Sequence, residues 1–337
     1  MDLEKQLQDM GKQQGPGQNE KTGTWADMEV VPPGEFDWYP WLPKGLLTLL
    51  TSQSGMGKSS LALRLAGCYL LGQPWPDGSP FKSEQGAVLW CEAEAAQAIN
   101  RDRANAWGYP LAKIYTPFTD PLTDVNLDDP EHREAVFNKA SLPEVKFVIV
   151  DSLSGSSSKR EKDDEIKTIT GFVALMARDI NKASLLTHHF RKKGNTDSEI
   201  ISLDRVRGHS VIVQLARVIW AMDAPDPYFP DEKRIQNIKN NLARFPEPIG
   251  VQITESGLVF TDAPETPREE TQSEKAMGLL ESLLSDGARP TAEIKKEFEG
   301  AGISWNTVTT AKKKLFITAK KGAVGWYWQL PESRVGK

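Results

Sequence analysis

The segment at residues 52–59, SQSGMGKS, constrains the fold more than any other part of the chain. It follows an apolar run at residues 46–50 and precedes a helix-forming run at residues 60–66. It matches the phosphate-binding pattern G-x-x-x-x-G-K-[S/T] except at the first position, where Ser52 replaces glycine. Serine is small, so we expect the loop to keep its form. A buried strand, a glycine turn and a helix start can hold a phosphate, because backbone amides and the helix dipole stabilise the anion.

The loop residues therefore predict a site for ATP and Mg²⁺. Lys58 would contact the β- and γ-phosphates and act in catalysis, and the Ser59 hydroxyl would bind the metal. The residues expected around the phosphates are Ser54, Gly55, Gly57, Lys58, Ser59 and Ser60. The alternative is an ordinary turn before a helix, which the strand, the Gly-Lys-Ser triplet and the helix together disfavour.

The composition is that of a soluble globular protein, with 39% hydrophobic and 26% charged residues among 337. Only two cysteines occur, which excludes a disulfide framework and suits a reducing cytoplasm. The N-terminal segment lacks the apolar core of a signal peptide. No apolar run approaches the ~20 residues of a membrane helix. We therefore expect a cytoplasmic protein without a membrane partner.

Charge is distributed unevenly along the chain. Residues 288–337 contain ten Lys and Arg against four Asp and Glu, a net charge of +6. The total is -5, so the rest of the chain carries -11. A basic appendage on an acidic body favours a nucleic-acid contact in the appendage, although a solvated lysine face is as good an explanation of charge alone.

Strand and helix patterns alternate after the phosphate loop, which predicts an α/β fold with a mostly parallel sheet. Apolar strands are expected at residues 86–91, 146–150 and 183–187, and each is followed by polar side chains. The carboxyl ends of parallel strands form the edge where ligands bind. Asp151 ends the second of these strands, and we expect it to support the metal; a turn aspartate is the alternative.

Composition shifts divide the chain into five regions. We expect a flexible arm at 1–28, an ATPase domain at 29–261, a linker at 262–272, a small domain at 273–331 and a tail at 332–337. The small domain should contain three helices, the second capped by Thr291 and the third by Ser304, followed by a hairpin; this is the composition of a winged helix. Strand alternation predicts that Trp326 and Trp328 share its core face. A protein-interaction module is the alternative to DNA binding.

With these motifs together, residues 38–260 resemble a RecA-like ATPase of the ring-forming replicative helicase group, such as the plasmid RepA and DnaB helicases and the AAA-type ATPases of phages and mobile elements. The resemblance implies that a glutamate past the second strand activates water, with Glu94 the better match and Glu92 its rival. It implies that His188 or His189 senses the γ-phosphate. It also implies that Lys239 or Arg244 completes the site of a neighbouring subunit, Lys239 by position and Arg244 by the chemistry of its guanidinium group.

The same resemblance places DNA contacts in the loop at residues 154–163 and in the segment at 191–210. The candidate nucleic-acid-binding residues are Arg191, Lys192, Lys193, Arg205 and Arg207, joined in the small domain by Lys312 and Lys313. Lysine and arginine contacts of this kind are made to phosphates and are independent of sequence. For the loop residues, the alternative is a solvated surface.

These expectations converge on an ATP-driven DNA motor, a helicase that moves along single-stranded DNA. The implied partners are a ring or filament of the chain itself, with a hexamer among the options, and proteins of replication or recombination. Two alternatives remain open. One is a RecA-type ATPase that loads or regulates DNA-processing proteins without unwinding, and the other is a DNA-binding regulator that ATP switches.

Overall fold

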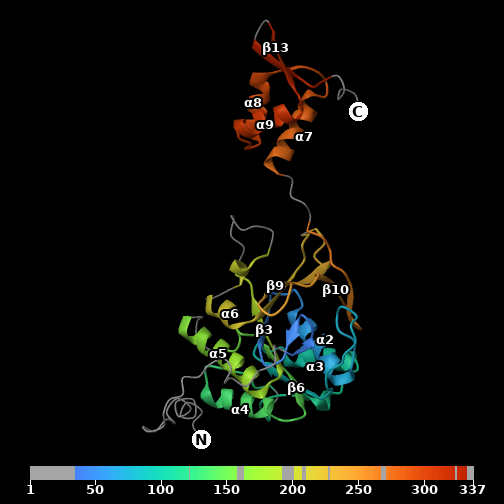
Figure 1. The fold of residues 1–337 in the computed structure, drawn as a ribbon, viewed down its shortest axis with the longest axis vertical. Coiled ribbons are helices and arrows are strands. Elements are labelled where there is room, and N and C mark those ends of the chain that lie inside the picture. Colours follow the sequence, from blue (N-terminus) through green and yellow to red (C-terminus); the bar gives the residue numbers. More distant parts are fainter. Residues whose placement is uncertain are drawn as a thin grey trace, which may run out of the picture. The chain divides into compact units, whose positions relative to one another are not determined.

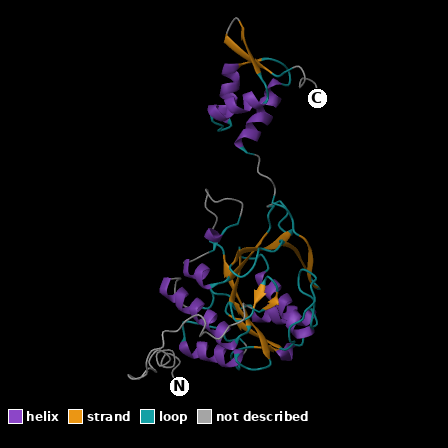
Figure 2. Cartoon of the chain, viewed as in Figure 1, coloured by secondary structure: helices purple, strands orange, loops and turns teal. Residues whose placement is uncertain are grey.

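The computed structural model describes residues 35–120, 122–157, 163–191, 201–206, 210–226, 228–266, 271–322 and 325–331. They form two compact units, divided between Thr266 and Pro267 (Figures 1 and 2). The arm expected at residues 1–28 and the tail expected at 332–337 lie outside the described residues.

The first unit is built on a sheet that has nine strands within the described ranges, in the order β11-β10-β9-β8-β3-β7-β6-β4-β5. The strands are β3 (Leu47–Ser52), β4 (Ala87–Glu92), β5 (Ile114–Tyr115), β6 (Val145–Asp151), β7 (Ala183–His189), β8 (Val218–Asp223), β9 (Lys233–Asn240), β10 (Ile249–Thr254) and β11 (Gly257–Asp262). Strands β8 to β5 pair in parallel, whereas β9, β10 and β11 pair antiparallel. A separate pair joins β1 (Phe36–Trp38) and β2 (Leu42–Pro43). The predicted α/β class with a mostly parallel sheet is confirmed.

Helices cover both faces of this sheet (Figure 1). One face carries α2 (Lys58–Leu71) and α3 (Gln97–Ala106), and the other carries α4 (Pro130–Ala140), α5 (Asp163–Ile180) and α6 (Ser210–Leu215). Successive side chains of a strand point to opposite faces, so the apolar run in β6 supplies both cores. Phe147 and Ile149 enter one hydrophobic cluster, and Val148 and Val150 enter the other.

Two parts of this unit are not evident from the sequence. Residues 211–220 look like one apolar element, but the structure divides them into the end of α6 and the start of β8. The backbone amide of Arg217 donates to Leu47 at the start of β3, so pairing with the central strand ends the helix. Helix α4 was not expected. Its signal is Asp129, whose side chain accepts from the amide of Glu131, followed by Pro130 in the first turn.

The second unit combines helices with a small antiparallel sheet. Its elements are α7 (Gln272–Leu284), β12 (Arg289–Pro290), α8 (Thr291–Gly300), α9 (Trp305–Lys314), β13 (Thr318–Gly322) and β14 (Gly325–Gln329). The strands lie in the order β12-β14-β13, and one apolar core joins Leu280, Phe298 and Trp328. This unit therefore has its own hydrophobic core.

Local details of the second unit correct two expectations and confirm one. Ser304 caps α9 as predicted, because its hydroxyl accepts from the amide of Thr307. Thr291 is the first residue of α8 and not its cap; its hydroxyl donates to the carbonyl of Trp326. Trp328 is buried, but Trp326 is 56% exposed, because it lies near the hairpin tip where the flanking residues are also exposed.

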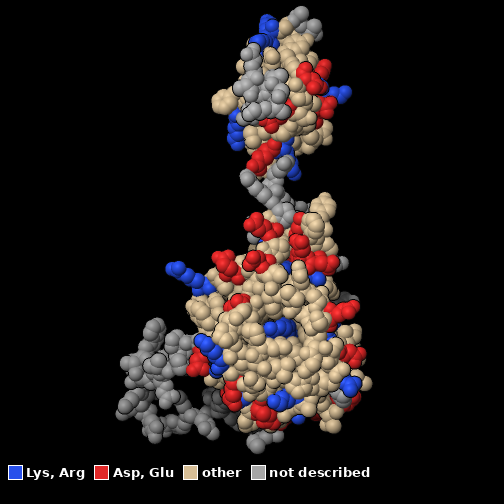
Figure 3. All heavy atoms as spheres, turned by 90° about the vertical axis from the view of Figure 1, so that its right-hand side faces the viewer, with Lys and Arg blue, Asp and Glu red and all other residues tan. Residues whose placement is uncertain are grey.

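Within the described parts of the chain, no helix is both long and apolar enough to cross a bilayer. On the face drawn in Figure 3, Asp and Glu side chains gather at one end of the first unit. Lys and Arg side chains appear at several places on the second unit.

Candidate nucleotide-binding and catalytic site

Strand register brings the predicted site residues to one edge of the sheet. At the end of β3, Ser52 lies opposite His189 of β7 and Met222 of β8. At the end of β4, Glu92 lies opposite Asp151 of β6. All of these strands are parallel, so their carboxyl ends meet at the edge where α/β proteins bind ligands.

The loop between β3 and α2 has the backbone of a phosphate cradle. Gly55 and Gly57 adopt φ angles of 78° and 101°, in the left-handed region that favours glycine. A Cβ atom on Gly57 would lie 2.3 Å from Cδ1 of Ile253, so the close approach also favours glycine. Helix α2 begins at Lys58 without a side-chain cap, which leaves its first amides available to an anion.

Ser52, the departure from the glycine pattern, fits into this cradle. It is fully buried, and its hydroxyl donates to the carbonyl of Gln53 over 2.7 Å. The same oxygen accepts from the Nζ atom of Lys58 over 3.3 Å. The serine therefore supports the lysine and keeps the loop form that was expected.

His189 connects Lys58 to Glu94. Its Nδ1 lies 3.3 Å from Nζ of Lys58, and its Nε2 lies 3.2 Å from Oε1 of Glu94. A lysine ammonium can only donate and a carboxylate can only accept, so a neutral imidazole with its proton on Nε2 satisfies both. Burial lowers the pKa of Lys58, and the charges of Asp151 and Glu94 oppose that shift.

Glu94 is the more accessible of the two candidate glutamates. Its side chain is 40% exposed and also accepts a hydrogen bond from the Ser152 hydroxyl. Hydrogen bonding from His189 lowers the pKa of Glu94 to about 2, burial opposes the shift, and the Ser152 bond reinforces it. Glu94 is therefore a carboxylate at neutral pH, in reach of the site. Glu92 is only 2% exposed.

Asp151 forms a small oxygen-rich group with two hydroxyls. It accepts from Thr187 Oγ1 over 2.5 Å and from the Ser59 side chain, and it is 3% exposed. Burial raises the pKa of Asp151, and these hydrogen bonds from Ser59 and Thr187 oppose that rise.

This group fits Mg²⁺. The described residues contain no group of three or more His, Cys, Asp and Glu that could hold a metal ion. Mg²⁺ does not need one, because it takes one or two protein oxygens and completes its shell with phosphate oxygens and water. Ser59 and Asp151 would supply those protein oxygens, and the bound ion would neutralise charge on the phosphates.

The two neighbouring histidines have different surroundings. His188 is fully buried, and its Nδ1 lies 3.4 Å from the Ser154 hydroxyl. His189 faces Lys58 and Glu94. Successive residues of a strand point to opposite sides, which explains the difference.

The structure places two of the five loop candidates for nucleic-acid contact. Arg191 is bound to the other end of its own loop, with Nε donating to the carbonyl of Asp204 over 2.8 Å and its amide donating to Arg205. Arg205 is only 5% exposed and lies over the Phe190 ring at 5.6 Å. Lys192, Lys193 and Arg207 lie outside the described residues, as do positions 158–162 of the other predicted loop.

The two candidates for contact with a neighbouring subunit also differ. The ammonium of Lys239 donates to the carbonyls of Val213 and Ala216 at the end of α6, over 2.5 and 2.7 Å. Burial lowers its pKa, and the nearby charge of Arg217 adds to this. Arg244 follows β9 and is exposed.

In the second unit, the lysines of α9 point in different directions. Lys312 lies over the Trp328 ring at 4.4 Å, and Trp305 stacks on the same ring. Lys314 donates to the Ser273 hydroxyl over 3.1 Å. Lys313 is exposed.

Three residues of the site were missed as candidates. Ser52 contacts Lys58, Thr187 holds Asp151, and Ser152 holds Glu94. Ser52 is the last residue of its strand, Ser152 directly follows a strand, and Thr187 lies two residues before the end of its strand. A position near a strand end is a signal that the sequence offers. Their side-chain types are too common at strand ends to single them out.

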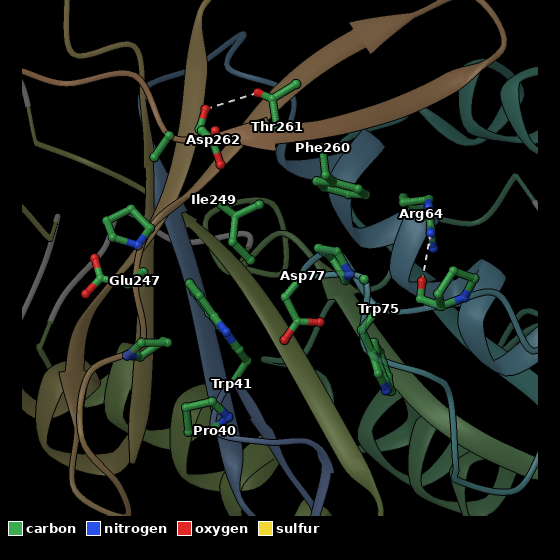
Figure 4. Close-up of a pocket in the computed structure, with 16 residues that line it drawn as sticks. Pro40, Trp41, Arg64, Trp75, Asp77, Glu247, Ile249, Phe260, Thr261 and Asp262 are labelled. Atoms are coloured by element: carbon green, nitrogen blue, oxygen red, sulfur yellow. Dashed lines mark hydrogen bonds between the residues drawn. The ribbon is translucent and has the colours of Figure 1, made fainter.

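A large cavity lies elsewhere in the first unit and shares no lining residue with this cluster. It measures about 930 Å³, and Arg64, Trp41 and Trp75 contribute to its wall (Figure 4). Arg64 donates to the carbonyl of Pro74 over 2.8 Å and lies over Phe260 at 5.5 Å. The size of the cavity therefore does not identify the catalytic site.

The fold and this edge define a RecA-like P-loop ATPase. A family model described as AAA domain (AAA_25) matches residues 20–195, slightly more than half of the chain. The chain therefore belongs to this AAA domain family.

The chain is also similar to solved structures. One of them is a KaiC-like protein from the hyperthermophilic archaeon Pyrococcus horikoshii OT3, with 16% identity, a TM-score of 0.49, and coverage of 68% of this chain and 98% of the other. No curated protein matches the chain.

Proposed function

We propose that this ATPase is an oligomeric DNA motor of the helicase type, which couples ATP hydrolysis to movement along single-stranded DNA. The observation that carries the ATPase part is the bridge from Lys58 through His189 to Glu94, beside the buried Asp151. One group for phosphate, one for the metal and one for water lie at the same sheet edge, which is what phosphoryl transfer to water requires.

Each residue then has one role. Lys58 and the amides at the start of α2 bind the phosphates, and Ser59 and Asp151 hold Mg²⁺. Glu94 orients the attacking water as a hydrogen-bond acceptor. His189 senses the γ-phosphate, because a phosphate that binds Lys58 competes with the imidazole for the same ammonium.

The DNA part of the proposal is supported by contacts between the phosphate cradle and the segment beginning at Arg191, which is proposed to bind DNA. The amide of Phe190 donates to the carbonyl of Ser52 over 2.8 Å, and Phe190 pairs with Val206 across the base of the loop. A movement of the cradle when nucleotide binds would therefore shift Phe190 and, with it, the start of the segment that contains Arg191, Lys192 and Lys193. In the proposed ring or filament, Arg244 of one subunit would face the nucleotide of the next.

We also propose that the second unit is a winged helix that binds DNA. Its support is the order helix, strand, two helices and hairpin, and the net charge of +6 over residues 288–337. Lys313 is the exposed lysine of α9 that would contact phosphate. Lys312 would contribute less, since it already packs on Trp328.

The first test is Lys58→Ala, with Arg64→Lys as a control that keeps a positive charge on the same helix. We expect Lys58→Ala to abolish ATP turnover and leave the fold intact by circular dichroism. Normal turnover in this variant would refute the assignment of the site.

The second test measures ATPase activity with and without single-stranded DNA, strand displacement on forked DNA, and the mass of the assembly. Stimulation by DNA, unwinding and an oligomer support the motor. ATPase activity without unwinding would favour a loader or regulator. Tight duplex binding with negligible turnover would favour an ATP-switched regulator.

A further inference from the structure

The second glutamate at the end of β4 has a structural arrangement of its own. The Glu92 side chain is buried and accepts three hydrogen bonds. Its Oε2 accepts from Nε1 of Trp90 over 3.1 Å and from Nδ2 of Asn100 over 3.0 Å. Its Oε1 accepts from the backbone amide of Glu94 over 3.0 Å. All three partners are donors, which matches a carboxylate, a group that can only accept.

The hydrogen bond to the Glu94 amide is one of three that fix the segment after β4. The amide of Ala93 donates to the carbonyl of Asp151, and the amide of Ala95 donates to the side chain of Asp124. Ala95 has a φ angle of 54°, so this segment turns sharply. Of these three amides, the middle one belongs to Glu94 itself, and a buried side chain holds it.

The carboxylate of Glu92 is itself held from α3. Asn100 donates to it and at the same time accepts from Nη1 of Arg103 over 3.0 Å, which fixes the orientation of its amide group. Burial raises the pKa of Glu92, and the hydrogen bond from the Glu94 amide opposes that shift. Trp90 and Asn100 also border a cavity of about 520 Å³. Its other lining residues include Leu63, Ala104, Leu111 and Ile114.

We propose that Glu92 is a positioning residue for catalysis, which fixes the backbone of Glu94 and thereby the direction of the Glu94 carboxylate, with Asn100 as its anchor. This inference rests on the proposed role of Glu94 in orienting water. Displacement of a catalytic group by about 1 Å can cost a factor of about 10² in rate. Glu92 itself does not touch the nucleotide in this assignment.

The test starts from Glu92→Gln. The substitution keeps the size of the side chain, but its NH₂ group can only donate. Wherever that group lies it faces a donor, the Glu94 amide on one side or Trp90 and Asn100 on the other. We expect kcat for ATP to fall by a factor of about 10², with KM changed by less than about twofold.

The double variant Glu92→Gln/Asn100→Asp gives the NH₂ group a carboxylate acceptor at position 100, which leaves the Gln oxygen to accept from the Glu94 amide, and it keeps the acceptor for Arg103. We expect it to recover at least about tenfold of the lost kcat, because the bond to the Glu94 amide is restored while only the Trp90 N–H loses its acceptor. Asn105→Asp, an exposed position on the same helix, is the matched control and should recover nothing in the Glu92→Gln background.

The outcomes separate this inference from the proposed function. Full turnover in Glu94→Gln would overturn both. An inactive Glu94→Gln with wild-type kcat in folded Glu92→Gln would overturn the inference alone. Loss of stability without loss of kcat, or equal kcat in the single and double variants, would also overturn it. If Glu92→Gln does not fold, Asn100→Ala replaces it, with an expected fall in kcat and an unchanged KM.

Discussion

At the scale of single residues, the site consists of a few polar side chains that form hydrogen bonds with one another. Lys58, His189 and Glu94 form one chain of hydrogen bonds, and Asp151 is held by two hydroxyls. In the proposed function, a nucleotide would replace the contact between Lys58 and His189 and leave Glu94 with its other partners. The hydrogen bonds from His189 and Ser152 keep Glu94, the residue proposed to orient water, ionised before a substrate arrives.

The pKa of Glu94 gives a prediction about stability and pH. Its value of about 2 in the folded protein lies below its usual 4.5, so ionised Glu94 contributes stability above pH 4.5, and this contribution is lost as the pH falls towards 2. Glu94→Gln should therefore lower the urea midpoint at pH 7, and the difference from wild type should narrow by pH 3.5. Glu255→Gln controls for the loss of one exposed negative charge. A difference that grows on acidification would contradict the assignment.

The sequence points to Lys58 through the P-loop pattern and to Asp151 because it ends an apolar strand, whereas the choice of Glu94 over Glu92 comes from the family resemblance. It could not choose between His188 and His189. That choice depends on which side chain faces the P-loop, which follows from strand register and not from neighbouring residues. Nor could it show that Lys239 is bound to the end of α6, since this contact joins residues more than twenty positions apart.

At the scale of elements, helix ends show where local sequence decides structure. Thr271 and Glu274 form a capping box at the start of α7, with hydrogen bonds in both directions. Helix α6 and strand β8 show the opposite case, in which pairing with β3 divides one apolar run. Local signals therefore fix helix starts better than they fix the boundary between a helix and a buried strand.

The capping box predicts a measurable change in local stability. Thr271→Ala should cost about 1 kcal/mol, equivalent to about fivefold faster hydrogen exchange in α7. Ser282→Ala, an exposed serine in the same helix, is the control and should not speed exchange. Unchanged protection in Thr271→Ala would show that core packing alone holds the start of this helix.

Lys313, the exposed lysine of α9 that is proposed to contact phosphate, gives a second prediction at the scale of elements. Lys313→Ala should weaken DNA binding by the full chain and reduce the slope of log affinity against log salt by about 1, because one phosphate contact is lost. Lys296→Ala, an exposed lysine of α8, is the control. Equal effects of the two substitutions would argue against a specific contact by α9.

At the scale of the whole molecule, the proposal requires a second copy of the chain. If Arg244 acts on the nucleotide of its neighbour, Arg244→Ala should lower turnover by about 10³–10⁵. Mixing inactive Arg244→Ala with inactive Lys58→Ala should restore part of the activity, because one chain supplies the arginine and the other the intact loop. Arg178→Ala, an exposed arginine of α5, should keep full turnover. No recovery on mixing would contradict action between subunits.

The cavity beside Trp90 and Asn100 has a consequence for inhibition. Its wall includes both side chains that hold Glu92, yet it shares no residue with the P-loop. A compound that occupied it and turned the Asn100 amide would slow hydrolysis while ATP still bound. Such an inhibitor would be non-competitive, and raising the cellular ATP concentration would not overcome it.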